Sequence, residues 1–307
     1  MTTKSRRLLD AIRDDRILVM PGVFDGFSCR LTERNGYTAG FITGSGVSES
    51  ATGWADMGVM GLDQNVAVAR NIASVTDMPL LADGDTGYGN AVNVHFATRA
   101  FEAAGVAGVM FEDQVWPKRC GHMSGKEVIP LDEGAAKIRA AREAAHDEAF
   151  VIMARTDTLA TDGVEEVVRR LNAYAEAGAS LLFADALMTA EQIDVVVREV
   201  DGPVCVNMGF GIRTRSTTPL LSARQLEELG VAAVIYPRML TSAALQGMQN
   251  AFDALARSLE TGEAEDRPDL QFDFETLNSL MGFDDLKALE ERHLTEAQKR
   301  AKYGQAA

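Results

Sequence analysis

Residues 79–113 read PLLADGDTGYGNAVNVHFATRAFEAAGVAGVMFED, and this stretch decides the fold. It opens with a short apolar run, 79–83, that ends in an acid. A glycine-rich turn leads into residues 92–104, where apolar positions recur at the three- and four-residue spacing of a helix. Gly105 marks the end of that helix. A second apolar run, 106–112, also ends in an acid, so the stretch is predicted to be one strand–helix–strand unit.

The same unit repeats through most of the chain. Eight apolar runs are candidate strands, at residues 17–20, 39–43, 79–83, 106–112, 150–155, 180–185, 203–207 and 232–236. Helical patterns lie at residues 62–75, 92–104, 132–145, 164–177, 190–200, 222–229 and 241–259. The expected caps are Asp132 and Ser222 at helix starts, and Gly105, Gly178 and Gly230 after helix ends. Alternating strands and helices require parallel pairing with right-handed crossovers, so we expect an α/β fold.

The positions of polar residues favour a (β/α)8 TIM barrel over an open doubly wound sheet. Polar side chains stand at the carboxyl ends of five different predicted strands, namely Asp83, Glu112, Arg155, Asp185 and Asn207. In a barrel such ends converge on one mouth. We therefore expect a catalytic barrel domain over residues 1–260. Residues 261–307, with helical segments near 274–281 and 284–293, form a C-terminal extension that is too small to fold alone.

Composition excludes several classes of partner. The 307 residues include 30 Lys and Arg but 45 Asp and Glu, a net charge of −15 that repels phosphate backbones and anionic membrane surfaces. The sequence shows neither the apolar stretch of a signal peptide nor one of about 20 residues that would span a membrane. We expect a cytoplasmic protein with no nucleic-acid or membrane partner. Its three cysteines are widely spaced, as free thiols are.

Four acids carry a metal hypothesis. Asp83 and Asp85 lie in DGDTGYGN, Glu112 lies in FEDQ, and Asp56 ends GWAD. Alternate residues at a strand end can point to the same side, and carboxylate oxygens suit Mg²⁺ or Mn²⁺. A turn rich in Asp and Gly, or ordinary capping, explains each acid taken singly. Four converging acids, however, need a divalent cation to be tolerated.

The segment 118–126, KRCGHMSGK, contains the one cysteine expected to be reactive. Cationic neighbours of Cys120 lower the pKa of a thiol and prepare it as a thiolate or a general acid. Cys29 and Cys205 lie in apolar surroundings and are expected to be inert. His122 has no second histidine at metal-ligand spacing, so we do not expect it to bind a metal.

Arg155 ends the run FVIMAR and offers a guanidinium at the predicted mouth. It could clamp a substrate carboxylate through two parallel hydrogen bonds. An ion pair with Asp157, two residues later, is the structural alternative.

Five motifs in order resemble the isocitrate lyase and phosphoenolpyruvate mutase superfamily, most closely its methylisocitrate lyase and 2,3-dimethylmalate lyase branch. They are TGSG at 43–46, ADGDTGYGN at 82–90, FEDQ at 111–114, KRCGH at 118–122 and ARTD at 154–157. The resemblance spans roughly residues 8–255. It implies a barrel whose last helix is exchanged between subunits, in a homotetramer built from dimers.

The same resemblance implies roles for individual residues. Mg²⁺ or Mn²⁺ would be held, largely through waters, by Asp56, Asp83, Asp85 and Glu112. The implied catalytic residues are Cys120, Arg155 and Glu112, with the cysteine protonating a carbanion. The implied substrate-binding residues are Thr43, Ser45, Gly46, Lys118, Arg119, Gly121, His122, Asp185 and Asn207.

The implied activity is Mg²⁺-dependent C–C bond cleavage. A substituted 2-hydroxy dicarboxylate or tricarboxylate, of the methylisocitrate or alkylmalate type, would yield a 2-oxo acid such as pyruvate plus a carboxylate. Oxaloacetate decarboxylation, or processing of phosphonopyruvate or carboxyphosphonoenolpyruvate, is the alternative within the superfamily. A barrel that binds a metabolite without catalysis is the alternative outside it.

The sequence departs from the methylisocitrate lyase pattern at three places. Phe41 stands where a tyrosine is usual near the substrate, and Asp185 stands where a glutamate is usual. Residues 208–216, MGFGIRTRS, carry two additional arginines that either bind further carboxylates or lie at the surface. The general base and the substituent on the acid therefore stay open.

Overall fold

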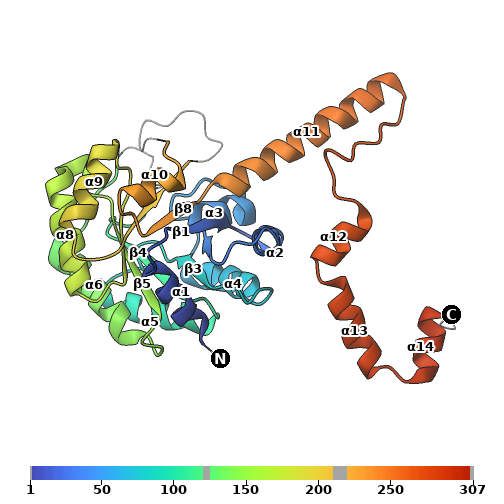
Figure 1. The fold of residues 1–307 in the computed structure, drawn as a ribbon, viewed down its shortest axis with the longest axis horizontal. Helices are drawn as coiled ribbons and strands as arrows, with labels where there is room; N and C mark the ends of the chain where they lie inside the picture. Colours follow the sequence, from blue (N-terminus) through green and yellow to red (C-terminus); the bar gives the residue numbers. More distant parts are fainter. Residues whose placement is uncertain (1, 120–124, 210–219, 305–307) are drawn as a thin grey trace. The chain divides into compact units, whose positions relative to one another are not determined.

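Eight parallel strands close into a barrel in the order of the sequence, from β1 to β8 (Figure 1). The computed structural model describes residues 2–119, 125–209 and 220–304. The strands are β1 Leu18–Val23, β2 Gly40–Ile42, β3 Leu80–Asp83, β4 Gly108–Glu112, β5 Val151–Thr156, β6 Leu181–Ala184, β7 Val204–Asn207 and β8 Ala233–Tyr236. Pairing of β1 with β8 closes the sheet. The predicted TIM barrel is confirmed.

Helices surround this barrel (Figure 1). Those of the first part of the chain are α1 Lys4–Ile12, α2 Gly26–Arg34, α3 Gly44–Thr52, α4 Leu62–Ala73, α5 Ala91–Ala103, α6 Leu131–Ala144, α7 Leu159–Asp162, α8 Val164–Glu176, α9 Ala190–Glu199 and α10 Ala223–Glu228. The helical patterns predicted from 62 to 229 match α4, α5, α6, α8, α9 and α10. Helices α1, α2, α3 and the short α7 were not predicted.

The predicted caps are correct except for one. Ser222 accepts a hydrogen bond from Gln225 N in a capping box. Gly105, Gly178 and Gly230 follow their helices with φ of +91°, +103° and +85°, a conformation that glycine adopts without strain. Asp132 is not the cap of α6, because the helix already begins at Leu131, after Pro130. Asp132 instead lies in the first turn, where an acid interacts favourably with the helix dipole.

The barrel interior is a packed core. Side chains that point inward from the strands, such as Met20, Phe41 and Phe183, are buried in one cluster with Leu8 and Ile12 of α1. A larger cluster fills the layer between the strands and the helices outside them. These two layers explain why the strands read as apolar on both faces. They hold the strand ends in place at the mouth.

The chain divides into two compact units, residues 1–244 and 245–307. Helix α11, Met239–Thr261, begins in the first unit and continues into the second. The second unit also holds α12 Phe274–Leu280, α13 Phe283–His293 and α14 Glu296–Tyr303, and it exposes many large apolar side chains. Among the described residues, no helix is both long and apolar enough to span a membrane.

Candidate active site

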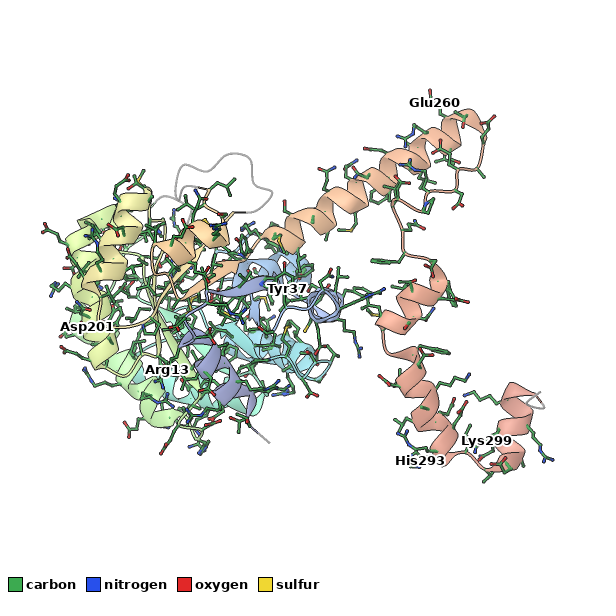
Figure 2. The ribbon with its side chains drawn as sticks, in the orientation of Figure 1. Arg13, Tyr37, Asp201, Glu260, His293 and Lys299 are labelled. Atoms are coloured by element: carbon green, nitrogen blue, oxygen red, sulfur yellow. The ribbon has the colours of Figure 1, made fainter. Side chains whose placement is uncertain are left out.

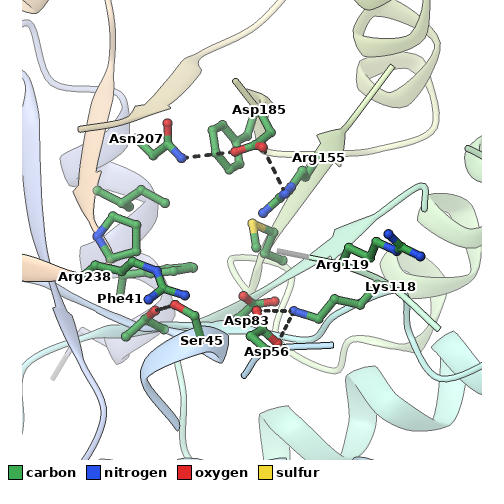
Figure 3. A pocket seen from close by; sticks show the side chains of 15 residues that line it. Phe41, Ser45, Asp56, Asp83, Lys118, Arg119, Arg155, Asp185, Asn207 and Arg238 are labelled. Carbon is green, nitrogen blue, oxygen red and sulfur yellow. Dashed lines mark hydrogen bonds and ion pairs between the residues drawn. The ribbon is translucent and has the colours of Figure 1, made fainter. Parts of the chain in front are cut away.

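A pocket opens among the carboxyl ends of the strands, where the sequence predicts the mouth (Figure 3). Its empty volume, counted together with the space that opens to solvent, is about 500 Å³. The lining side chains are Phe41, Thr43, Ser45, Asp56, Asp83, Met110, Lys118, Arg119, Arg155, Phe183, Asp185, Asn207, Ile235, Pro237 and Arg238. Nine of the predicted site residues thus come together here, from segments far apart in the sequence.

Lys118 forms the centre of an acidic cluster at one side of the pocket. Its Nζ lies 2.6 Å from Asp56 Oδ1 and 2.8 Å from Asp85 Oδ1, and the lysine side chain is only 3% exposed. Burial lowers the pKa of Lys118, but the carboxylates of Asp85, Glu112, Asp56 and Asp83 outweigh burial and raise it well above its usual value. Lys118 is therefore a fixed positive charge among acids.

The turn after β3 positions the two aspartates of DGD. The backbone N–H of Asp85 donates to Asp83 Oδ1 over 3.0 Å, and Asp85 takes a left-handed conformation with φ of +51°. Gly44 N donates to Asp83 Oδ2 over 3.3 Å. A Cβ on Gly44 would lie only 2.6 Å from that oxygen, so glycine is required for this approach. The N–H of Glu112 donates to the Asp85 carbonyl over 2.9 Å and joins the second acidic motif to the first.

Burial dominates the acidity of these carboxyls. It raises the pKa of Asp85 to about 6, and it also raises the pKa of Asp83 and of Glu112, although Lys118 and Arg155 oppose the shift. Each of these groups would ionise more readily beside an added positive charge.

The donor chemistry of the cluster fits a divalent cation. Within the described residues, the buried oxygens Asp85 Oδ1 and Glu112 Oε1 make no hydrogen bond, although the first of them faces the ammonium of Lys118. Hard carboxylate oxygens of this kind are the ligands that Mg²⁺ and Mn²⁺ prefer. The described residues contain no group of three or more His, Cys, Asp or Glu side chains arranged to hold a metal. The acids therefore match a divalent cation in the type of their ligand atoms, but the described side chains do not form a complete coordination shell.

Arg155 forms the centre of a second cluster of charged side chains. Its Nε and Nη2 each donate to Asp157 over 2.8 Å, so the Arg–Asp pair considered as an alternative is formed. The guanidinium also lies 3.3 Å from Glu112 and 3.3 Å from Asp185. Lys126 Nζ adds contacts of 2.8 Å to Asp157 and 3.4 Å to Asp185. Burial raises the pKa of Asp157, but Arg155 and Lys126 outweigh it and hold the pKa below its usual value.

The first turn of α3 forms the opposite wall of the pocket. Thr43 caps this helix by accepting a bond from Gly46 N, and its Oγ1 lies 3.2 Å from Ser45 Oγ. A helix N-terminus with hydroxyls beside it favours anions. Across the mouth, Asn207 donates to Asp185 Oδ1 over 3.1 Å and fixes that carboxylate.

Sequence reasoning missed three residues that support the site. Lys126 and Asp157 pair at the mouth, although the sequence indicated only a loop position for the first and an ion pair for the second. Asp113, the second acid of FEDQ, accepts from Tyr174 Oη over 2.8 Å, from Arg170 Nη1 over 3.1 Å and from Asp157 N over 3.0 Å. It fixes the end of β5 rather than lining the pocket. In the sequence, only its position next to Glu112 indicates that Asp113 supports the site.

The cysteine predictions are partly testable. Cys29 and Cys205 are buried free thiols, and burial raises the pKa of Cys29 to about 11 and raises that of Cys205 as well. The expectation that both are inert is thus supported. Cys120, Gly121 and His122 lie outside the described residues, as do the two arginines of the 208–216 segment. Arg119, which precedes them, is fixed through its backbone N–H, which donates to Gln114 Oε1 over 3.0 Å.

An eight-stranded parallel barrel whose mouth gathers buried acids, a lysine and an arginine defines a TIM-barrel enzyme. The family model described as phosphoenolpyruvate phosphomutase matches residues 9–256. The chain belongs to this family, the phosphoenolpyruvate mutase/isocitrate lyase superfamily of lyases and mutases, as the sequence motifs indicated.

Relatives carry several activities in their names. The chain is 37% identical to the chloroplastic carboxyvinyl-carboxyphosphonate phosphorylmutase of Arabidopsis thaliana, over 95% of this chain and 84% of that protein. It is 37% identical to a 2-methylisocitrate lyase of Shewanella oneidensis, over 79% of this chain and 83% of the relative. A crystal structure of 2,3-dimethylmalate lyase superposes with a TM-score of 0.86 at 32% identity, covering 95% of this chain and 96% of the other.

Proposed function

We propose that this protein is a Mg²⁺- or Mn²⁺-dependent C–C lyase. Its substrate would be a substituted 2-hydroxy dicarboxylate or tricarboxylate, and its products a 2-oxo acid such as pyruvate plus a carboxylate. The observation that carries the proposal is the acidic cluster around Lys118, facing Arg155 across one pocket. Relatives named 2-methylisocitrate lyase and 2,3-dimethylmalate lyase support the reaction class.

The residues of the pocket divide between binding and orientation. Arg155 and the N-terminus of α3, with Ser45 and Gly46, would bind the carboxylate of the 2-hydroxy acid, since a guanidinium and a helix N-terminus both attract anions. Asp185 and Asn207 form a hydrogen-bonded pair at the same mouth and would orient the hydroxyl end. Lys118 would stabilise negative charge on the substrate oxygens from its fixed position.

Asp56, Asp83, Asp85 and Glu112 are the residues that would hold the divalent cation. When bound, such a cation supplies a Lewis acid that favours negative charge on oxygen.

The bond change itself is simple to state. When a base of the site takes the hydroxyl proton, the C2–C3 bond can break. Its electron pair passes to the departing carboxylate fragment while C2 becomes a carbonyl. On sequence grounds we propose that the Cys120 thiol gives its proton to that fragment. Residues 117–126 would exclude water during this step.

Decarboxylation of oxaloacetate, or the processing of a phosphonate, is the second candidate. The Arabidopsis relative named carboxyvinyl-carboxyphosphonate phosphorylmutase is as similar to the chain as the named lyases are. Phosphonopyruvate or oxaloacetate would place an anion on the same Arg155 and α3 groups. Turnover of either compound, with none of the alkylmalates, would favour this alternative.

We also propose that the protein is a homotetramer in which the tail, 261–307, packs on a neighbouring subunit. Apolar side chains of this tail support the proposal, because Phe272, Phe274 and Leu286 are 54%, 81% and 63% exposed. Surfaces of this kind usually mark contacts between proteins. The cytoplasmic location stays a prediction.

A substrate panel tests the proposed reaction. We expect pyruvate to be released from 2,3-dimethylmalate or 2-methylisocitrate in the presence of Mg²⁺, measured with a coupled dehydrogenase. The Cys120→Ser variant should lose at least about 100-fold in turnover, the usual scale of a lost general acid. Cys205→Ser is the matched control, because that thiol is buried in the barrel. Undiminished turnover of Cys120→Ser would remove the thiol from the mechanism.

A further inference from the structure

Arg238 lines the pocket, although it belongs to none of the sequence motifs. It follows β8 by two residues and lies beside Phe41 and Ser45, across the pocket from Lys118 and Arg119 (Figure 3). A cation at this place has a different task from Lys118.

Glu49 holds the guanidinium in a fixed orientation. Arg238 Nη2 donates to Glu49 Oε1 over 2.7 Å, and Nη1 donates to Oε2 over 3.2 Å. Glu49 belongs to α3, the helix whose first turn lines the same pocket. The two side chains are 26% and 30% exposed, so the pair stands at the rim and not in the core. A guanidinium held through two parallel bonds loses little freedom when it binds an anion.

The surroundings of Arg238 differ from those of Arg155. Phe41, Ile235 and Pro237, which share the lining with Arg238, carry no hydrogen-bonding group in their side chains. Arg155, in contrast, lies within 3.3 Å of carboxylate oxygens from Asp157, Glu112 and Asp185. An anionic group that lies against Phe41 would therefore have the Arg238 guanidinium beside it.

We propose that Arg238 is a specificity-determining residue that binds a third carboxylate, so that the substrate is a tricarboxylate rather than an alkylmalate. This inference rests on the proposed lyase function for the identity of the reacting end. In it, Arg155 and the α3 N-terminus take the carboxylates near the broken bond. Arg238 takes the distal one, and Glu49 is a positioning residue.

Binding of two unreactive acids tests the proposal directly. Tricarballylate has three carboxylates and succinate has two, and neither has the hydroxyl needed for cleavage. We would measure binding by calorimetry on the full chain with Mg²⁺. Arg238→Met should lower the affinity for tricarballylate about tenfold or more, which corresponds to about 1.4 kcal/mol. The same variant should lower the affinity for succinate less than about twofold. Arg238→Lys should have an intermediate affinity for tricarballylate, because an ammonium keeps the positive charge but cannot form two parallel hydrogen bonds to a carboxylate. Arg224→Met is the matched control, since Arg224 pairs with Glu228 on an exposed helix.

The outcomes separate this inference from the lyase proposal. If Arg238→Met lowers the affinity for both acids equally, or lowers neither affinity, the proposed role of Arg238 is wrong. Selective loss of tricarballylate supports it even if no acid of the panel is cleaved, in which case the lyase proposal alone fails. If cleavage occurs, KM for 2-methylisocitrate should rise about tenfold in Arg238→Met, while kcat and the constants for 2,3-dimethylmalate stay within about twofold.

Discussion

Replacing Lys118 by Met should convert the acidic cluster into a site whose stability depends on Mg²⁺. Lys118 Nζ lies 2.6 Å from Asp56 and 2.8 Å from Asp85. At an effective dielectric constant of about 20, each contact is worth about 6 kcal/mol of gross attraction. Burial of the charges cancels much of this gain, and loss of one partner of a buried pair typically costs about 3–5 kcal/mol. We expect that loss in the free energy of unfolding when EDTA is present.

Mg²⁺ should restore part of the stability, because it would compensate the same carboxylates. At about 100 times its Kd, a ligand of the folded state adds about 2.7 kcal/mol. Urea unfolding followed by circular dichroism, in EDTA and in Mg²⁺, measures both quantities. Lys137→Met is the matched control, because Lys137 is also buried but donates to the Thr86 carbonyl. The reasoning fails if Lys118→Met is as stable as the unsubstituted protein in EDTA, or if Mg²⁺ leaves the stability of Lys118→Met unchanged.

Two further substitutions test other parts of the mouth. Gly44→Ala should lower the affinity for Mg²⁺ about tenfold in calorimetry, because the new Cβ would lie 2.6 Å from Asp83 Oδ2. Gly26→Ala is the control, because a Cβ at that position meets nothing within 4 Å. Equal Mg²⁺ affinities of the two variants would contradict the expectation. Asp157→Asn should alter the pH dependence of stability. Arg155 and a neighbouring lysine outweigh burial and lower the pKa of Asp157, so its stabilising effect is complete above the unfolded value of about 4 and is lost as pH falls through the folded value. Urea titrations from pH 3 to 7 should show a shallower acid loss in the variant, whereas parallel curves would count against this account.

The fold could be predicted because each strand carries its own local signal. Apolar runs that end in a polar residue, followed by helical periodicity, do not depend on distant contacts. Strand β1 shows the limit of this reasoning. Pro21 and Gly22 are residues that usually interrupt a strand, but in the structure the strand continues through them to Val23. Pro21 pairs with Tyr236, and a Cβ on Gly22 would meet Pro237 O at 2.4 Å. Only the closed barrel reveals these contacts.

Helix α3 and the ion pairs of the mouth were less predictable, for different reasons. The sequence of α3, GSGVSESAT, has weak helix formers and no apolar stripe, and its start depends on the Thr43 cap. The pairing of Lys126 with Asp157 joins two separate loops, so no spacing in the sequence indicates it. Arg238 looks like any other arginine until its neighbours Glu49 and Phe41 are known.

The hydrogen bonds of Asp113 have a consequence for protein engineering. Arg170 and Tyr174 belong to α8, in the outer layer of helices (Figure 2). Both nevertheless donate a hydrogen bond to Asp113, the residue next to Glu112. A change on the inward face of that helix is thus transmitted to the end of β5 without touching any ligand. Libraries built to retune this enzyme should therefore include α8 positions, and selections are expected to enrich substitutions there.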